Sequence, residues 1–324
     1  MQIYYSWQGI KEKYHNLVVG LGNFDGVHLG HQKLIEKLVK EAKRIKGTSA
    51  VFTFYPHPDV VLNPSDYHPL LLTQETKRNL IARLGVNLFI QIPFNTEFAR
   101  ITALDFVKKI LYRELGVHTI FIGYNYTFGY KGEGTAELLK ESGSMYGFTV
   151  QVISPVIVNR QVVSSTYIRN LLLQGKVTEA RDFLGYYPFV EGMVVSGEQR
   201  GNLLGFPTAN LEPETELLIP ARGVYAVKIK VEEGTYWGVA NIGVKPTFHP
   251  QKNKINLEAH ILDYYGNLYH RWIKVIFLKR LREEKKFSSP EELITQIKHD
   301  IYQVRSYSLY NNNNNNNIDN IIYQ

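Results

Sequence analysis

The stretch NLVVGLGNFDGVHLGHQKLIEKLVKEAKR, residues 16–44, joins an apolar run to a segment with helical spacing through a turn rich in glycine and histidine. Residues 16–21 predict a buried strand, and residues 30–44 repeat apolar side chains at the spacing of an amphipathic helix. A buried strand followed at once by a helix is the first half of a βαβ unit. The stretch therefore predicts a parallel α/β sheet with a polar turn at a strand end.

The same alternation continues through the first half of the chain. Further strands are predicted at 48–54, 86–92, 118–123 and 148–154, and helices at 73–84, 102–115 and 134–147. A helical stretch at 165–185 closes this half. Ligands of such sheets bind beyond the carboxyl ends of the strands, which is where residues 22–32 are expected to lie.

The pattern changes after residue 185. Alternating or β-branched runs with glycine turns cover 189–197, 223–243, 254–266 and 271–281, and one capped helix is predicted at 289–301. We interpret this half as a small antiparallel β-barrel with a terminal helix. The final segment, 306–324, contains seven successive asparagines, which bury too little apolar surface to fold, and we predict a disordered tail.

Composition sets the broad class. A chain of 324 residues is long for a single core, so two domains are expected. Its hydrophobic content of 44% and charged content of 21% are ordinary for a globular protein. The net charge of +7 favours polyanionic partners, namely nucleic acid, an anionic membrane or a phosphorylated small molecule.

The sequence shows no sign of export or membrane insertion. The first residues lack the basic and apolar regions of a signal peptide, and no apolar run approaches the roughly 18 residues of a membrane span. The absence of cysteine excludes disulfides and thiolate metal sites and fits a reducing compartment. We therefore expect a cytoplasmic protein without a membrane partner.

His28 and His31 suit metal binding, proton transfer or phosphate binding. An isolated pair of this kind is most simply two partly exposed histidines at a helix end. A zinc site would need a third ligand, and no H-E-x-x-H pattern is present. Gly22, Gly26 and Gly30 let the backbone approach a ligand, and the start of the helix offers free N–H groups to an anion. The pattern therefore favours phosphate binding.

The motif GNFDGVHLGHQ, residues 22–32, resembles the HxGH signature of the adenylyltransferase superfamily. Its full form is similar to that of the bacterial bifunctional riboflavin kinase/FMN adenylyltransferase family, also called FAD synthetase. Further segments agree in order: FTFYPHP (52–58), LLTQETKRNLIARLGV (71–86), GYNYTFGYKGEGT (123–135), VVSSTYIRNLL (162–172), GNLLGFPTANL (201–211), IPARGVYAV (219–227), GVANIGVKPTF (238–248) and LEAHILDYYGNLYH (257–270).

The resemblance implies a fold of class α/β + β. It comprises a Rossmann-like HxGH nucleotidyltransferase domain over residues 1–185 and a riboflavin kinase-like antiparallel β-barrel with a terminal helix over 186–305, followed by the asparagine-rich tail. The implied reactions are riboflavin + ATP → FMN + ADP in the barrel and FMN + ATP → FAD + pyrophosphate in the first domain, both with Mg²⁺.

For the first domain, the resemblance implies that His28 and His31 bind the ATP phosphates and stabilise charge on the α-phosphorus. The implied ATP- and FMN-binding residues are Gly22, Phe24, Asp25, Gly26, His28, Gly30, His31, Asn125, Ser164, Ser165, Thr166 and Arg169. The last four could equally form an ordinary N-cap with a solvated arginine. His57, between two prolines, is left out because a stiff turn explains it.

For the second domain, the resemblance implies that Glu258 is the base for the riboflavin hydroxyl. Thr208 and Asn210 would meet Mg²⁺ and the phosphates, as hard oxygen ligands. Gly201 and Gly205 would shape a loop over the nucleotide, and Arg282 would lie near the flavin. The simpler alternatives are a solvated glutamate on a strand and turn-forming residues after Pro207.

Three positions depart from the family pattern. Asn125 stands where the family often has Asp, Lys131 is the only basic residue in the following loop, and His270 occupies a position where Gly is common. A positive φ at His270 would strain the local backbone. These departures leave open a flavin- or nucleotide-sensing protein with inactive sites, or an adenylyltransferase with an inert barrel.

Small-molecule substrates are the expected partners: riboflavin, FMN and ATP. A nucleic-acid partner is the weakest alternative, because no basic cluster interleaved with aromatic residues and no RNA-binding motif accompanies the positive charge. Phosphate-rich substrates account for that charge equally well. The sequence does not determine an oligomeric state.

Overall fold

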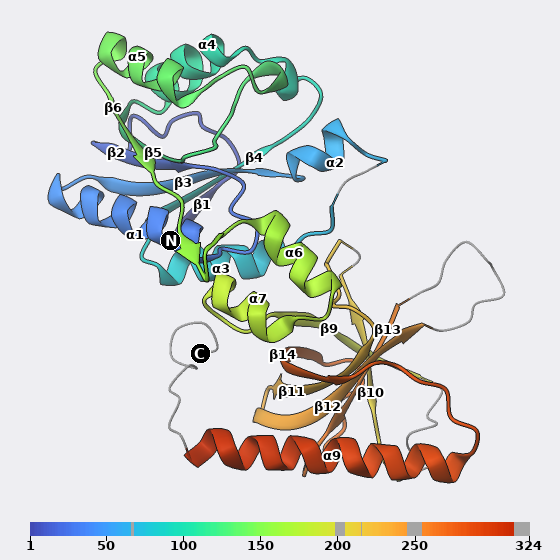
Figure 1. Cartoon of the computed structure of the whole chain (residues 1–324). Coiled ribbons are helices and arrows are strands. Elements are labelled where there is room, and N and C mark those ends of the chain that lie inside the picture. The colour runs from blue at the N-terminus through green and yellow to red at the C-terminus, as the bar shows by residue number, and fades with distance from the viewer. Residues whose placement is uncertain (66–67, 198–204, 215, 245–254, 314–324) are drawn as a thin grey trace. The chain divides into compact units, whose positions relative to one another are not determined.

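The computed structural model describes residues 1–65, 68–197, 205–214, 216–244 and 255–313. The chain divides into two compact units, Met1–Ser165 and Thr166–Gln324, each of which is described by itself (Figure 1). No helix in the described ranges is both long and apolar enough to span a membrane.

The first unit is built on a six-stranded sheet in which all neighbouring strands are parallel, in the order β1-β4-β3-β2-β5-β6. The strands are β1 (Gln2–Tyr4), β2 (Leu17–Leu21), β3 (Thr48–Tyr55), β4 (Leu88–Pro93), β5 (Val117–Gly123) and β6 (Thr149–Ile153). The predicted α/β class is confirmed. The three-residue edge strand β1 was not predicted, because it is too short and too exposed to show an apolar pattern.

Helices cover both faces of this sheet. They are α1 (Leu29–Arg44), α2 (Pro58–Leu62), α3 (Gln74–Arg83), α4 (Ala103–Asp105) and α5 (Ala136–Tyr146), with the π-helix η2 (Phe106–Glu114) continuing α4 and short 3-10 turns η1 (Phe98–Arg100) and η3 (Tyr130–Gly132). A small hairpin pairs β7 (Ile157–Val158) with β8 (Gln161–Val162). Figure 1 shows α4 and α5 on one side of the sheet and α1 and α3 on the other.

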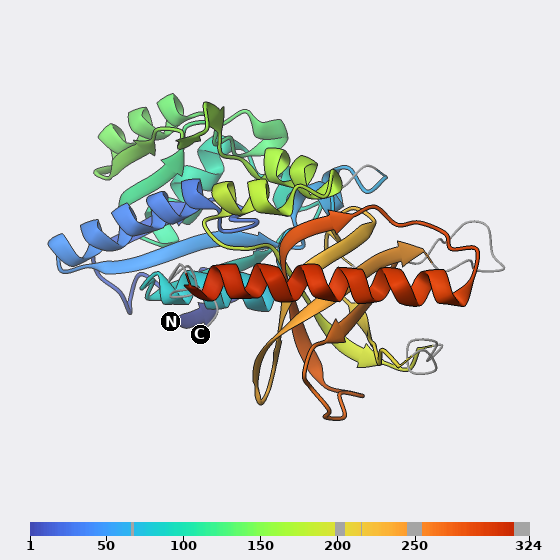
Figure 2. The same ribbon diagram turned by 60° about the horizontal axis from the view of Figure 1, so that its bottom comes forward.

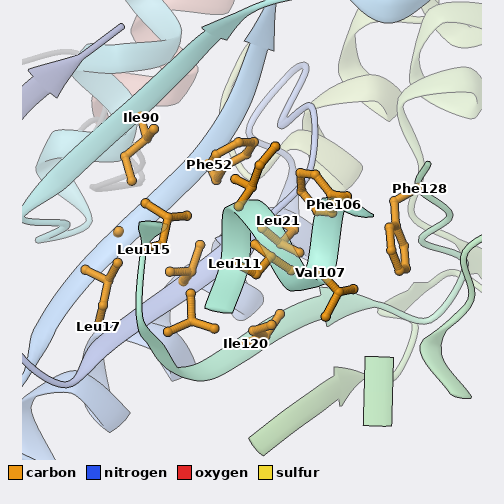
Figure 3. Close-up of a cluster of buried hydrophobic side chains, with 14 of the residues drawn as sticks. Leu17, Leu21, Phe52, Ile90, Phe106, Val107, Leu111, Leu115, Ile120 and Phe128 are labelled. Carbon is orange, nitrogen blue, oxygen red and sulfur yellow. The ribbon is translucent and has the colours of Figure 1, made fainter. Parts of the chain in front are cut away.

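One hydrophobic core of this unit lies between the sheet and η2 (Figure 3). Phe106, Val107 and Leu111 of η2 are buried against strand residues that include Leu21 and Phe52, and the Phe52 and Phe106 rings meet edge to face at 5.9 Å. Complete burial of each such side chain stabilises the fold by about 1.5–3 kcal/mol. This packing fixes the carboxyl ends of β2 and β3.

The strand order reverses at β2. Strands β3 and β4 lie on one side of it and β5 and β6 on the other. Crevices at such a reversal, beyond the carboxyl ends of the strands, are the usual ligand sites of open α/β sheets. The turn after β2 and the loop after β5, which contain His28 and Asn125, both follow carboxyl ends of strands at this reversal.

The second unit contains a closed antiparallel barrel in the order β10-β13-β12-β11-β14-β9, which confirms the predicted barrel. Its strands are β9 (Phe189–Val195), β10 (Ala209–Pro213), β11 (Gly223–Val231), β12 (Gly234–Val244), β13 (Ile255–Ile261) and β14 (Trp272–Arg282). Strand β10 was not predicted, since the sequence indicated a loop there. Two helices, α6 (Ser165–Leu173) and α7 (Val177–Leu184), replace the single predicted run, because Gly175 has φ +74° and ends the first.

A long helix, α9 (Pro290–Asn313), lies along the barrel (Figure 2). Buried Val304 packs with Ala226 and Leu262 of the barrel, and Tyr307 meets the Trp237 ring edge to face. The helix is longer than predicted, so residues 306–313 of the expected tail are helical. Residues 314–324 lie outside the described residues.

His270 has φ +64°, which is the left-handed conformation that the sequence analysis identified as a source of strain. The residue is exposed. We predict that His270→Gly raises the free energy of unfolding by about 0.5–1 kcal/mol, because glycine adopts this φ without a steric penalty. Urea denaturation measures the change. His270→Ala retains the penalty and should bring no gain; an equal gain in both variants would contradict the strain argument.

Candidate active sites

The turn between β2 and α1 has an unusual backbone. Phe24, Gly26 and Val27 have φ values of +52°, +81° and +36°. A left-handed conformation is uncommon outside glycine and is an outlier for a β-branched residue such as Val27. Conformations of this kind persist only where the surroundings fix them, and they concentrate at ligand sites.

Asp25 fixes the centre of this turn. Its side chain is only 5% exposed, and the two carboxylate oxygens accept the Leu71 backbone N–H at 3.0 and 3.3 Å. The Ser165 hydroxyl donates to the Asp25 carbonyl oxygen at 2.9 Å. The structure therefore brings two predicted site residues, Asp25 and Ser165, into contact although they are far apart in sequence.

The carbonyl oxygen of Asn23 fixes the start of the turn. It accepts hydrogen bonds from the Thr53 hydroxyl at 3.3 Å and from the Lys77 ammonium at 3.2 Å. Neither donor was predicted. Lys77 lies in the segment LLTQETKRNL, where an isolated lysine on a helix gives no sign that it is buried.

His28 is the N-cap of α1. Its Nδ1 accepts the His31 backbone N–H at 3.3 Å, and the two imidazoles stack with ring centroids 3.6 Å apart. Burial, with smaller contributions from His28 and Lys77, holds the pKa of His31 well below its ordinary 6.5. The His31 ring is therefore neutral at pH 7. Its Nδ1 is buried without a hydrogen-bond partner among the described residues.

Two glycines leave room for these rings. A Cβ on Gly30 would lie 3.1 Å from Cε1 of His28, and a Cβ on Gly22 would lie 3.3 Å from the Phe24 ring. The Phe24 ring lies 5.3 Å from that of His31. The predicted residues from Gly22 to His31 therefore form one packed unit at the helix start, where N–H groups and the helix dipole attract anions.

The remaining predicted residues of the first site are less closely connected. Asn125 is exposed in the loop after β5, and Ser164 is half-buried. The Lys131 ammonium lies over the Tyr130 ring at 5.3 Å. Thr166 and Arg169 belong to the second unit, within α6. Their roles remain predictions.

The predicted kinase residues lie across neighbouring barrel strands. Glu258 of β13 is in register with Asn210 of β10 on one side and with Asn241 of β12 on the other. Directly paired residues point to the same face of a sheet, so the three side chains form a polar row. The Asn256 amide donates to Glu258 Oε1 at 2.6 Å. Asn241 and Asn256 were not predicted, because register cannot be deduced from the separate strand sequences.

Asn210 is suited to binding a hard cation, which prefers oxygen ligands. It is 7% exposed, and its Oδ1 is a buried acceptor with no hydrogen-bond partner in the described part of the chain. Thr208 is half-buried immediately before β10. The described residues contain no cluster of three or more His, Asp or Glu side chains that could hold a metal. The residues fit Mg²⁺, which takes few protein ligands and completes its shell with phosphate and water oxygens.

Arg282 has a structural partner. Its guanidinium donates through Nε and Nη2 to the buried carboxylate of Asp300, which ties β14 to α9. The flavin contact of Arg282 stays a prediction. Gly205 has φ +83°, as a tight loop requires. Gly201 lies outside the described residues.

Comparisons with known proteins identify both units. The FAD synthetase family model matches residues 10–167, and the riboflavin kinase family model matches residues 184–308. The chain thus joins two modules of flavin-nucleotide synthesis.

Curated relatives carry the same two modules. Proteins named bifunctional riboflavin kinase/FMN adenylyltransferase match from Buchnera aphidicola subsp. Schizaphis graminum (37% identity, 92% of this chain, 96% of the relative), Bacillus subtilis (37%, 90% and 92%) and Escherichia coli K12 (35%, 90% and 92%). The chain belongs to the bifunctional riboflavin kinase/FMN adenylyltransferase family.

A solved structure shares the fold. A crystal structure described as a macrolide-efflux protein from Streptococcus pneumoniae matches with a TM-score of 0.84 at 32% identity, covering 94% of this chain and 98% of that one. The efflux description belongs to that protein, and neither family model matched by this chain carries it.

We predict that Gly30→Ala lowers FAD formation from FMN about 10-fold, because the new methyl group displaces the His28 ring from the helix start. The helix itself should not weaken, since alanine is the better helix former by up to about 1 kcal/mol. FAD production with riboflavin kinase activity as internal reference measures the effect. Glu36→Ala, at an exposed residue further along α1, is the control for an added alanine in the same helix. Equal FAD formation by wild type and Gly30→Ala would show that adenylyl transfer does not depend on the position of the His28 ring.

Proposed function

We propose that the chain makes FMN in the barrel and converts FMN to FAD in the α/β unit, at two separate sites. The observation that carries the proposal is the pairing of two polar sites with two family matches. The stacked His28 and His31 rings lie within the FAD synthetase match, and the Asn210–Glu258 pair lies within the riboflavin kinase match. This pairing favours an enzyme over a sensing protein.

In adenylyl transfer, an FMN phosphate oxygen attacks the α-phosphorus of ATP. A new P–O bond forms to FMN while the bond to the β-phosphate breaks, and pyrophosphate leaves. Negative charge grows on the phosphate oxygens, and donors placed before the reaction stabilise it. We assign this role to the imidazole N–H groups of His28 and His31 and to the free backbone N–H groups at the start of α1. No protein nucleophile is required.

In phosphorylation, the terminal hydroxyl of the ribityl chain loses its proton to Glu258 as its oxygen attacks the γ-phosphorus of ATP, and ADP leaves. Asn256 orients the Glu258 carboxylate through its 2.6 Å hydrogen bond. Asn210 and Thr208 would hold Mg²⁺, which neutralises phosphate charge when bound. A base positioned in this way contributes about 10²–10⁴-fold to the rate.

The proposal includes the finer expectations from the sequence. Residues 1–185 and 186–305 are the two catalytic domains, and both reactions use Mg²⁺. The partners are small molecules rather than nucleic acid or membrane, and the location is cytoplasmic. Thr166 and Arg169 contribute phosphate contacts to the first reaction, and Arg282 lies near the flavin in the second.

We predict that Glu258→Gln lowers FMN formation by about 10²-fold or more, because the amide cannot accept the hydroxyl proton. FAD formation from supplied FMN should persist. Incubation with riboflavin, ATP and Mg²⁺, followed by separation of riboflavin, FMN and FAD, measures both steps. Glu283→Gln, at a carboxylate that is 87% exposed, is the matched control. Equal loss of both activities in Glu258→Gln would contradict two sites, and a wild type without turnover would favour sensing.

A further inference from the structure

The first unit contains a buried cation that the proposed chemistry does not use. Lys77 of α3 is only 5% exposed, although lysine is almost never fully buried without a compensating partner. Its ammonium donates to the neutral carbonyl oxygen of Asn23 at 3.2 Å. The nearby Asp25 carboxylate accepts the Leu71 N–H.

Keeping this charge buried is unfavourable. Burial is the largest influence and lowers the pKa of Lys77 from 10.5 to about 8, while the Asp25 charge opposes the shift and the Arg78 charge adds to it. A methionine of similar length would avoid the desolvation penalty. Stability alone therefore does not explain a lysine at this position.

The geometry connects Lys77 to the histidines. Two hydrogen bonds, from Leu71 N–H to the Asp25 carboxylate and from Lys77 Nζ to the Asn23 carbonyl, hold the residues on either side of Phe24. Phe24 has φ +52°, and its ring lies 5.3 Å from that of His31. A hydrogen bond from a charged donor is roughly twice as strong as one from a neutral donor. The ammonium form thus holds the left-handed turn against which His31 packs.

We propose that Lys77, as an ammonium ion, is a positioning residue for adenylyl transfer, which it serves by holding the Asn23 carbonyl and with it the turn that carries Phe24 and His28. The inference rests on the proposed function of the first unit. It assigns Lys77 no contact with substrate. The residue acts through the turn and through the positive charge that it places beside an anion-binding helix start.

Lys77→Met separates positioning from folding. FAD formation from FMN should fall at least about 10-fold, while riboflavin kinase activity of the same chain is unchanged. The urea midpoint should change little, because removing the buried ammonium relieves its desolvation penalty but also removes its attraction to the buried Asp25 carboxylate. Lys40→Met, at an exposed lysine of α1, is the matched control and should change neither activity. Lys77→Arg keeps the charge and should recover part of the lost FAD formation.

The pH dependence provides a second readout. Between about pH 8 and 10.5 the folded chain has released the Lys77 proton that the unfolded chain still binds, so this residue makes stability rise with pH. FAD formation should fall over the same range. Among the described residues, the charged or titratable groups that interact with Lys77 are Asp25, His31 and Arg78. Lys77→Arg should move the falling limb to higher pH.

The possible outcomes separate the positioning role of Lys77 from the proposed function of the first unit. Wild-type FAD formation in Lys77→Met, or an unshifted alkaline limb in Lys77→Arg, overturns the inference and leaves the proposed function intact. Loss of both activities together with a lower urea midpoint assigns Lys77 to folding and also overturns it. A wild-type chain that makes no FAD overturns the proposed function, and the inference with it.

Discussion

The first site depends on one buried hydrogen-bonded pair, the Asp25 carboxylate and the Leu71 N–H. This pair holds a turn whose backbone is left-handed at Phe24, Gly26 and Val27 and therefore strained in isolation. Loss of the carboxylate would leave a buried N–H unsatisfied, at a cost of about 1–3 kcal/mol. The same turn places His28 at the start of α1, so this contact helps to set the geometry of the proposed phosphate site.

The second site depends on strand register rather than on a turn. Asn210, Glu258 and Asn241 come from three strands, and antiparallel pairing aligns them in one row. A shift of one residue in any strand would turn its side chain to the opposite face. In the proposed mechanism, the barrel supports the base Glu258 and the oxygen ligand Asn210 on paired strands, whereas the α/β unit provides a helix start and imidazole donors. The two proposed phosphate-transfer sites are therefore built from different structural elements of one chain.

Sequence predicted most of the fold and only part of each site. Strong periodicity predicted the main strands and helices of the first unit, and the glycines around His28 and His31 predicted a phosphate site, which stays a prediction. The three-residue strand β1 was too short to show a pattern, and β10 was hidden because the glycines and Pro207 before it indicated a loop. A glycine inside 165–185 divided a helix that looked continuous. Lys77 and Asn256 were missed because their importance lies in burial and in contacts that only tertiary structure creates.

The most direct test of two independent sites is a mixing experiment with two inactive chains. Glu258→Gln should lack the first step, and His28→Ala should lack the second. Each variant alone, given riboflavin, ATP and Mg²⁺, should produce no FAD, and the His28→Ala chain should accumulate FMN. The mixture should produce FAD after FMN has appeared, because FMN released by one chain is used by the other. A mixture that produces no FAD would contradict the account.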